Sequence, residues 1–348
     1  MLRVVKAPLV VGGLFLVFVM SYFPRALETR HPETSDLVIG IALTANHGTV
    51  SLRNKDGSFT DLGRIEGSLE YTKLMRRLAS QESWHLSNPY NSLDDMWDDW
   101  PRQILRSVRK SIGLPASSEV AVIARFLKDI LAHVEARVGR SPSALISFPA
   151  LPGLFQEDIV DAVSYIGLRS LGNGFQKHPH EMVAAYAGNG LGLSTSCSGP
   201  GTCDKAGDKF EVRHTVLAEY TEAALLLHHG YMDKALEIPD AEMRLKVSFD
   251  LGSGRQPGEE DLRAFFLEFL SRVYTIGGSF EAPEKITVIL TGSSDSVVDG
   301  KVENASKAAV LALPSKFEGF FDSSGYIAAR GAAELAWRAL SPEENMEI

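Results

Sequence analysis

Two groups of histidines are the residues of this chain with the clearest capacity for metal chemistry. His178 and His180 flank a proline just before Glu181, and His228 is followed by His229. Protein zinc sites use a His-x-x-x-His pair on one helix or closely spaced cysteine and histidine ligands, and neither spacing occurs here. Surface and packing roles account better for these histidines, so the sequence predicts no metal site.

A cluster of four aspartates is the next group that could bind a cation. It falls in a segment with a helical pattern, between Glu70 and Lys110, which is interrupted at Pro89 and Pro101. More often such a cluster is the solvated start of a helix, where the helix dipole favours acidic side chains. The cluster consists of Asp94, Asp95, Asp98 and Asp99, which surround Met96, Trp97 and Trp100.

The two cysteines of the chain, Cys197 and Cys203, are separated by a short loop that contains glycine and proline. A redox or metal role would favour a tighter Cys-x-x-Cys pair or further ligands nearby. In an oxidising compartment, two thiols that close such a loop form a disulfide. We therefore expect a Cys197–Cys203 disulfide if the globular part lies outside the cytosol.

Several common activities have no signature in the sequence. It contains no Gly-x-Ser-x-Gly elbow, no Walker loop and no dinucleotide fingerprint, so hydrolase and dehydrogenase functions lack support. The net charge is −9, and Lys and Arg form no dense stretch. Nucleic-acid binding needs basic residues gathered on one face to replace the counterions of the phosphates. We therefore expect no nucleic-acid partner.

The first residues of the chain carry a membrane signal. Arg3 and Lys6 precede an uncharged run of 17 residues, from Ala7 to Phe23. This length is short for a membrane-spanning helix and long for the core of a signal peptide. A signal-peptide cleavage site has small residues just before it, and no such residues immediately precede Ala26. This favours an uncleaved, single-pass anchor. The globular part would then lie in the secretory-pathway lumen or outside the cell; a secreted protein is the alternative.

The first half of the globular part has a clear order of predicted elements. A strand pair lies within residues 37–52, and a long amphipathic helix lies within residues 119–138. A glycine and a proline end that helix, a buried strand follows at residues 144–148, and another amphipathic helix includes residues 159–166.

The second half repeats this order. A strand pair at residues 212–217 and 223–227 precedes a long helix at 259–274 and a buried strand at 286–290, with helices after it. Repetition on this scale predicts two similar α/β lobes. The predicted parts are an anchor and linker (1–36), lobe I (37–190), an insertion or linker (191–211), lobe II (212–340) and a tail (341–348).

Five short motifs, taken in order, resemble the nucleotide-binding domain of the seventy-kilodalton heat-shock chaperones, which belong to the actin and hexokinase fold. The likeness covers residues 37–340. It implies a duplicated, two-lobed actin-like (ribonuclease-H-like) ATPase fold with a nucleotide cleft between the lobes. The motifs are Ile39–Leu43, Val138–Pro142 with Phe148–Ala150, His180–Tyr186, Thr291–Ser294 and Ala328–Ala333.

The first phosphate hairpin departs from the family pattern. In the family, this hairpin carries an aspartate that organises the magnesium and its water, followed by Gly-Thr-Thr. Here Ala42 stands where the aspartate would be, and Thr44, Ala45 and Asn46 follow. A methyl group cannot hold the water shell of a metal ion.

The second phosphate hairpin departs as well. The family has an aspartate followed by Gly-Gly-Gly-Thr, whose amides approach the phosphates closely. The matching run here begins at Glu219, and a slip of one residue would place Ala218 there instead. Side chains on Thr221 and Glu222 block this approach, and Glu222 adds a negative charge beside a negative ligand.

The resemblance nevertheless implies a candidate cleft. Glu181 matches a family carboxylate near the waters of the bound metal, and Gly292 belongs to the adenosine motif. The alternatives are that Glu181 is only an acid at a helix start and that Gly292 only lets the strand turn. The candidate cleft residues are Thr44, Asn46, Glu181, Glu219, Gly292, Ser293 and Ser294.

Two functions remain open. The first is a membrane-tethered, non-catalytic (pseudo-ATPase) binding or scaffold protein with an unidentified protein partner. The second is an ATPase or small-molecule kinase of the same fold with an altered metal site. Ala42 and the lost glycines favour the first function. The resemblance, which ends at residue 340 of the 348, also implies a protein without the peptide-binding domain of the family. No cofactor is required, although ATP, ADP or a nucleoside could still enter the cleft.

Overall fold

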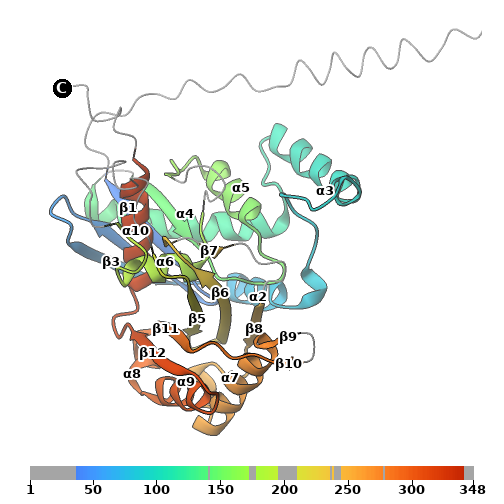
Figure 1. The fold of residues 1–348 in the computed structure, drawn as a ribbon. Helices are drawn as coiled ribbons and strands as arrows, with labels where there is room; N and C mark the ends of the chain where they lie inside the picture. The colour runs from blue at the N-terminus through green and yellow to red at the C-terminus, as the bar shows by residue number, and fades with distance from the viewer. Residues whose placement is uncertain are drawn as a thin grey trace, which may run out of the picture. The chain divides into compact units, whose positions relative to one another are not determined.

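The computed structural model describes residues 37–139, 142–171, 178–194, 210–235, 237–238, 244–276 and 279–340 (Figure 1). The predicted anchor and linker (1–36), the cysteines of the predicted disulfide (Cys197 and Cys203) and the predicted tail (341–348) lie outside these residues. The described residues have a mixed α/β fold with two large sheets.

The first large sheet is built around β1 (Val38–Leu43), a run of six buried residues. It pairs in antiparallel with β2 (His47–Arg53), which pairs in antiparallel with β3 (Phe59–Glu66). β4 (Ser143–Ser147) lies parallel to β1 on the other side, so the strand order is β3-β2-β1-β4. β1 and β4 are buried throughout, which suits the apolar sequence of β1 and the apolar centre of β4.

Helices α2 (Leu69–Leu78), α4 (Ser118–Val138) and α5 (Gln156–Ile166) share one hydrophobic cluster with this sheet. The Ser117 side chain caps α4 at its start, and Gly139 ends it in the left-handed conformation. Between α2 and α4 lie the short helix η1 (Gln81–Ser83) and α3 (Leu93–Ser111). No residue of α3 belongs to a hydrophobic cluster of the described residues.

The second large sheet repeats the arrangement of the first. β5 (Arg213–Tyr220) and β6 (Leu225–Met232) form an antiparallel hairpin, β8 (Arg244–Ser248) pairs with the outer side of β6, and β11 (Lys285–Gly292) lies parallel to β5. Helices α7 (Glu259–Val273) and α9 (Lys301–Leu311) pack on this sheet. The remaining elements are β7 (Glu237–Ile238), η2 (Ser253–Arg255), β9 (Thr275–Ile276), β10 (Ser279–Phe280), α8 (Ser294–Val298) and β12 (Lys316–Phe321).

The predicted order of strand pair, long helix and buried strand is therefore present in both halves. In each half a hairpin is extended by a third antiparallel strand and by a parallel strand on the opposite side. The second sheet continues beyond β11 with the parallel strand β12. At the corresponding edge of the first sheet, the described residues form two isolated parallel bridges instead of a strand, Ala144–Ser170 and Phe148–His180. Strands β3, β8 and β12 were not predicted from the sequence.

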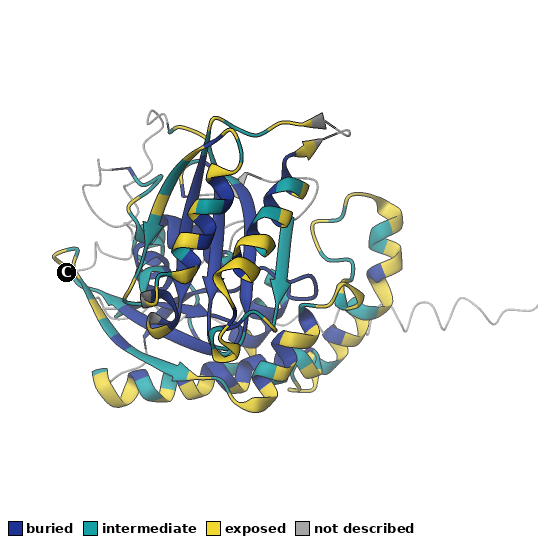
Figure 2. Cartoon of the chain, turned by 90° about the horizontal axis from the view of Figure 1, so that it is seen from below, coloured by how far each residue is buried: buried dark blue, intermediate teal, exposed yellow. Residues whose placement is uncertain are grey.

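Two small-residue helices, α6 (Glu181–Gly188) and α10 (Ile327–Ala339), cross in the layer between the sheets. A Cβ atom on Gly331 would lie 1.8 Å from the carbonyl oxygen of Ala184, so the crossing requires glycine at this position. α10 also packs against β1, so the end of the predicted second lobe lies on the first sheet. Figure 2 shows the buried strands at the centre and exposed helix surfaces around them.

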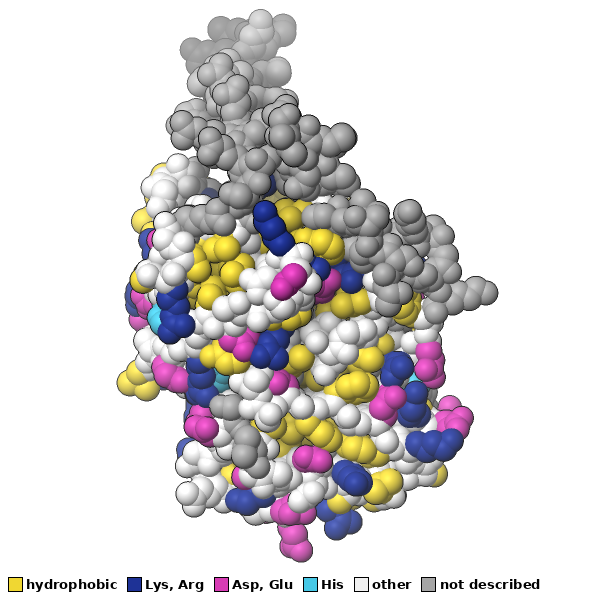
Figure 3. Space-filling model, turned by 90° about the vertical axis from the view of Figure 1, so that its left-hand side faces the viewer, with side chains coloured by type: hydrophobic (Ala, Val, Ile, Leu, Met, Phe, Trp, Pro, Cys, Tyr) yellow, Lys and Arg dark blue, Asp and Glu magenta, His cyan; other side chains and the backbone are white. Residues whose placement is uncertain are grey.

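The surface of the described residues shows no concentration of one charge on the face in Figure 3, where basic and acidic side chains are interspersed. Among the described helices, none combines the length and apolar character needed to cross a bilayer.

Candidate functional site

The turn between β1 and β2, residues 44–47, is held by its own polar groups. The Thr44 amide donates to the His47 carbonyl oxygen at 2.9 Å, and the His47 amide donates to the Thr44 hydroxyl at 3.1 Å. The Asn46 amide lies 3.5 Å from the same hydroxyl, and the Ala45 amide donates to Glu219 Oε1 at 2.9 Å. All four amide groups of this turn therefore already face an acceptor within the protein.

The turn between β5 and β6, residues 221–224, is closed in a similar way. The Thr221 amide donates to the Ala224 carbonyl oxygen at 3.0 Å, and the Ala224 amide donates to the Thr221 hydroxyl at 3.2 Å. Ala42 and Glu219 hold equivalent places, because each precedes the last paired residue of its hairpin. The second hairpin thus carries a carboxylate at the position where the first carries a methyl group.

The carboxylate of Glu222 connects the two turns. Its Oε2 accepts hydrogen bonds from the Ser293 hydroxyl at 2.6 Å, the Arg64 guanidinium at 2.9 Å and the Asn46 side-chain amide at 3.1 Å. These donors come from β3, the first turn and the residue after β11. An acidic oxygen of the protein therefore lies at the point where polar donors from both halves of the chain converge.

The charges around this bridge keep Glu222 ionised. Partial burial opposes ionisation, but hydrogen bonds from Ser293, Asn46 and Arg64 lower the pKa of Glu222 to about 2. Burial and the positive charge of Arg64 lower the pKa of His47 to about 3, so its imidazole is neutral at physiological pH. The bridge is thus an ionised carboxylate facing one guanidinium and two neutral donors.

Directly beside this bridge, Glu181 and Glu219 form a buried acid pair. Both residues are 1% exposed. Glu181 Oε1 accepts a hydrogen bond from the Thr291 hydroxyl at 2.7 Å, while Glu219 Oε1 accepts from the Ala45 amide. The remaining oxygen of each carboxyl group has no donor among the described residues apart from the other carboxyl group.

The acid pair holds a proton. Burial raises the pKa of Glu219 well above its usual range, and the adjacent charge of Glu181 raises it further. Burial also raises the pKa of Glu181, which hydrogen bonds from Glu219 and Thr291 partly offset. Two carboxyl groups in contact share one proton, because both cannot be ionised at this separation.

The end of β11 supplies the remaining candidate residues. Gly292 has φ +120°, and a Cβ atom there would lie 2.0 Å from the carbonyl oxygen of Tyr220. Because β5 approaches so closely, only a residue without a side chain fits at position 292. Ser293 is buried and donates to Glu222, and Ser294 begins α8.

A magnesium–phosphate group of the heat-shock type does not fit these turns. The Ala42 side chain offers no oxygen at β1 and is buried in the cluster that contains α6. The amides of residues 44–47 are paired within the protein, and the Glu222 carboxylate occupies the position between the turns. η2 also covers the second turn, since the Ser253 amide donates to the Thr221 carbonyl oxygen at 2.9 Å. Among the described residues, no three His, Cys, Asp or Glu side chains form a metal-binding group.

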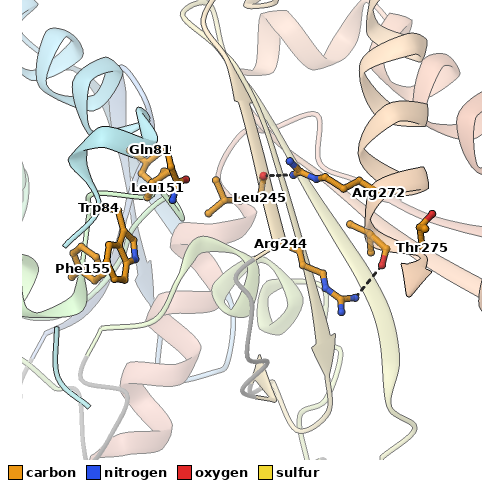
Figure 4. A pocket seen from close by; sticks show the side chains of 10 residues that line it. Gln81, Trp84, Leu151, Phe155, Arg244, Leu245, Arg272 and Thr275 are labelled. Carbon is orange, nitrogen blue, oxygen red and sulfur yellow. Dashed lines mark hydrogen bonds between the residues drawn. The ribbon is translucent and has the colours of Figure 1, made fainter. Parts of the chain in front are cut away.

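A separate cavity of about 490 Å³ lies at the end of β8 that is remote from these turns (Figure 4). Trp84 and Phe155 line one side, and Arg244 and Arg272 line the other. The Arg272 guanidinium donates to the Leu245 carbonyl oxygen at 2.7 Å, and that of Arg244 donates to the Val273 carbonyl oxygen at 3.2 Å. These arginines join β8 to the end of α7.

The structure brings together five of the predicted cleft residues: Asn46, Glu181, Glu219 and Ser293, with Gly292 supporting the backbone. The Thr44 side chain instead closes its own turn. The parts played by Arg64 and Thr291 were not predicted from the sequence. A strand prediction for residues 59–66 would have placed Arg64 beside the first turn.

No protein-family model matches the sequence, and no curated protein matches it. Among solved structures, the chain is similar to the ethanolamine utilization protein EutJ from Carboxydothermus hydrogenoformans. The two share 11% sequence identity over 87% of this chain and 90% of that chain, with a TM-score of 0.41. A likeness this distant does not define the site, which is defined by the strand order of the two sheets and the contacts of the hairpin turns.

Proposed function

We propose that this chain is a non-catalytic binding or scaffold protein with the two-lobed fold of actin and the heat-shock ATPases, tethered to a membrane by its first residues. The repeated strand order in the two large sheets supports the fold, as do the two helices that cross between them. The uncharged run from Ala7 to Phe23 supports the tether. The globular part would lie in the secretory-pathway lumen or outside the cell and would bind a protein partner.

The bridge formed by Glu222 is the main evidence that the chain does not catalyse phosphoryl transfer. Phosphoryl transfer on such a fold depends on a metal ion and on donors that position the phosphates and neutralise their charge. Here Asn46, Arg64 and Ser293 already donate to a carboxylate of the protein. A phosphate would have to displace that carboxylate, and repulsion from it would oppose binding.

ATP hydrolysis and nucleotide binding by the purified protein test this proposal. We expect no magnesium-dependent turnover and no rise in melting temperature with ATP or ADP for the unmodified chain. Ala42→Asp combined with Glu222→Ala restores an acid at β1 and removes the bridge, and should give a nucleotide-dependent rise. Glu66→Ala is the matched control, since Glu66 also pairs with Arg64 but does not bridge the turns. Magnesium-dependent turnover by the unmodified chain, abolished in Glu181→Gln, would contradict the proposal.

One observation favours the second candidate, an ATPase or small-molecule kinase with an altered metal site. Glu181 and Glu219 present two carboxyl oxygens to each other in the interior, and a divalent cation could replace their shared proton. Thermal-shift titration with Mg²⁺ and Mn²⁺ separates the two candidates. Stabilisation that is lost in Glu219→Gln would support a metal site, whereas an unchanged melting temperature supports the non-catalytic protein.

The tether has its own test. We expect the full-length chain to remain with membranes after carbonate extraction and its globular part to be protected from protease added on the cytosolic side. Recovery of the chain in the soluble fraction of the lumen or the medium would instead indicate a secreted protein.

A further inference from the structure

Helix α3 is attached to the rest of the protein by its charged side. Arg106 is 5% exposed and donates to Asp158 at 2.8 Å and to Asp161 at 2.7 Å, both on α5. Lys110 donates to Asp161 at 2.8 Å, and Arg102 pairs with Glu157. The buried residues of α3 are Asp99 and Arg106, so the contact with the body is ionic rather than apolar.

The opposite side of α3 is apolar and faces solvent. Leu93, Trp97, Trp100, Ile104 and Val108, here called the outer stripe, fall on one face at the helical period of 3.6 residues. Their exposed fractions lie between 48% and 72%. The rings of Trp97 and Trp100 are in contact, with centroids 5.6 Å apart.

This orientation is the reverse of that of an ordinary surface helix, which turns its apolar side inward. The ion pairs with α5 fix the rotation of α3, so the outer stripe cannot turn toward the core without breaking them. A continuous apolar surface of this kind marks a site of contact with a partner or a membrane. Figure 1 shows α3 at the edge of the body, beside α5.

The segment between the N-terminal run and β1 is short enough to hold the outer stripe near a membrane. Residues 24–37 join the uncharged N-terminal run to β1 and span at most about 50 Å when fully extended. A body of about 310 residues has a radius of gyration near 20 Å. A tether of this length therefore keeps every face of the body within reach of the bilayer and raises the effective concentration of α3 at its surface.

The chemistry of the outer stripe fits a bilayer interface. Tryptophan is favoured at the depth of lipid headgroups, and amphipathic helices lie there with their apolar side inserted by about 5–10 Å. Arg102, Arg106 and Lys110 pair with acids of α5, and Arg109 donates to the Pro115 carbonyl oxygen. Asp94 and Asp98 remain exposed near the outer stripe. This charge pattern favours a zwitterionic leaflet over an anionic one.

We propose that α3 lies on a zwitterionic membrane surface through its outer stripe, and so fixes the orientation of the body on the membrane; this rests on the proposed tether. The N-terminal run keeps the protein at the bilayer, and the ionic contacts between α3 and α5 transmit the orientation of the helix to the sheets. A protein that covers the same stripe is the competing explanation.

Tryptophan quenching in the full-length chain tests the proposal. The chain contains four tryptophans, and Trp84→Phe with Trp337→Phe leaves Trp97 and Trp100 as the emitters. We expect phosphatidylcholine vesicles with brominated acyl chains to reduce this emission relative to unbrominated vesicles. Ile104→Glu, added to this double variant, should abolish the loss of tryptophan emission. Leu311→Glu, an equally apolar-to-charged change at a residue 58% exposed on α9, should leave it intact.

Each other outcome overturns the proposal in a distinguishable way. Flotation with the vesicles without quenching would leave the tether standing and exclude contact through α3. Failure to float would refute the tether and the proposal together. Unquenched emission with crosslinking of Trp97→Cys to a second protein would assign the outer stripe to a protein partner. Stronger quenching on replacement of phosphatidylcholine by phosphatidylserine would refute the zwitterionic assignment.

Discussion

Glu181, in the first turn of α6, and Glu219, in β5, are neighbouring buried acids, and the charge of Glu181 raises the pKa of Glu219. The two residues belong to different halves of the chain. Burial of two acids at one point is unfavourable unless they share a proton, and the shared proton makes the interior of this fold sensitive to pH.

Glu219→Gln should therefore flatten the dependence of stability on pH. The pKa of Glu219 is raised in the folded protein, so its contribution to stability is complete below the ordinary pKa of glutamate and is lost as the pH rises toward the folded value. Between those limits the unmodified protein should lose about 1.4 kcal/mol per pH unit relative to the variant. Urea unfolding of both proteins from pH 4 to 8 measures this difference, and parallel curves would contradict a shared proton.

Glu222→Gln should act in the opposite direction. The pKa of Glu222 is lowered to about 2, so its contribution is present above the ordinary pKa of glutamate and is lost as the pH falls toward 2. Because its side chain is 38% exposed, we expect an effect below about 1 kcal/mol. Between pH 6 and pH 3, the free energy of unfolding should fall less in the variant than in the unmodified protein. Glu66→Gln provides the comparison at the other carboxylate bound to Arg64.

Arg106→Met should detach α3. Removing this cation leaves Asp158 buried without its main partner, which typically reduces stability by about 3 kcal/mol or more. Chemical denaturation measures the loss, and Arg106→Met with Asp158→Leu should recover most of it. Arg125→Met is the matched control: Arg125 pairs with Glu70 where both side chains are more than half exposed, so its loss should be below about 1 kcal/mol. Equal effects of the two single changes would refute the role assigned to Arg106.

Gly331→Ala should separate α6 from α10. The added methyl group would meet the backbone of Ala184, and such overpacking costs about 1–3 kcal/mol or forces the helices apart. Gly258→Ala is a suitable control, because the nearest atom to its new Cβ is a flexible carboxylate oxygen of Asp261 at 3.2 Å. Thermal unfolding should show a lower melting temperature for the first variant than for the second. A similar melting temperature for both would indicate that the crossing can relax.

The buried strands and long helices could be predicted because their patterns are local. β1 is an uninterrupted apolar run, and β4 and β11 have apolar centres rich in leucine, isoleucine and valine. α4 has apolar residues at four-residue spacing, with a serine before it and a glycine after it. The edge strands β3 and β12 were missed, since one side of each is only partly covered and their sequences mix charged, glycine and aromatic residues. Their place is set by pairing with distant strands.

The orientation of α3 could not be predicted for a different reason. Periodicity shows which residues share a face, but the partner decides which face turns inward. The aspartates of residues 94–99 were interpreted together as a solvated helix start, which describes Asp94 and Asp95 in the first turn. Asp99 is buried instead, with hydrogen bonds from Tyr90, Arg102 and Gln103. These partners lie on or next to α3, and Arg102 and Gln103 also bind Glu157 of α5, a contact that the local pattern does not show.

The contact between α10 and β1 has a consequence for the synthesis of the protein. Among the described residues, the last helix covers the first strand, and nearly 290 residues separate the two. At 5–20 residues per second, a ribosome needs roughly 15–60 s to make the residues between them. Throughout that time α10 cannot cover the apolar side of β1. The first sheet must therefore either persist in an incomplete form or be shielded by other factors until α10 has been synthesised.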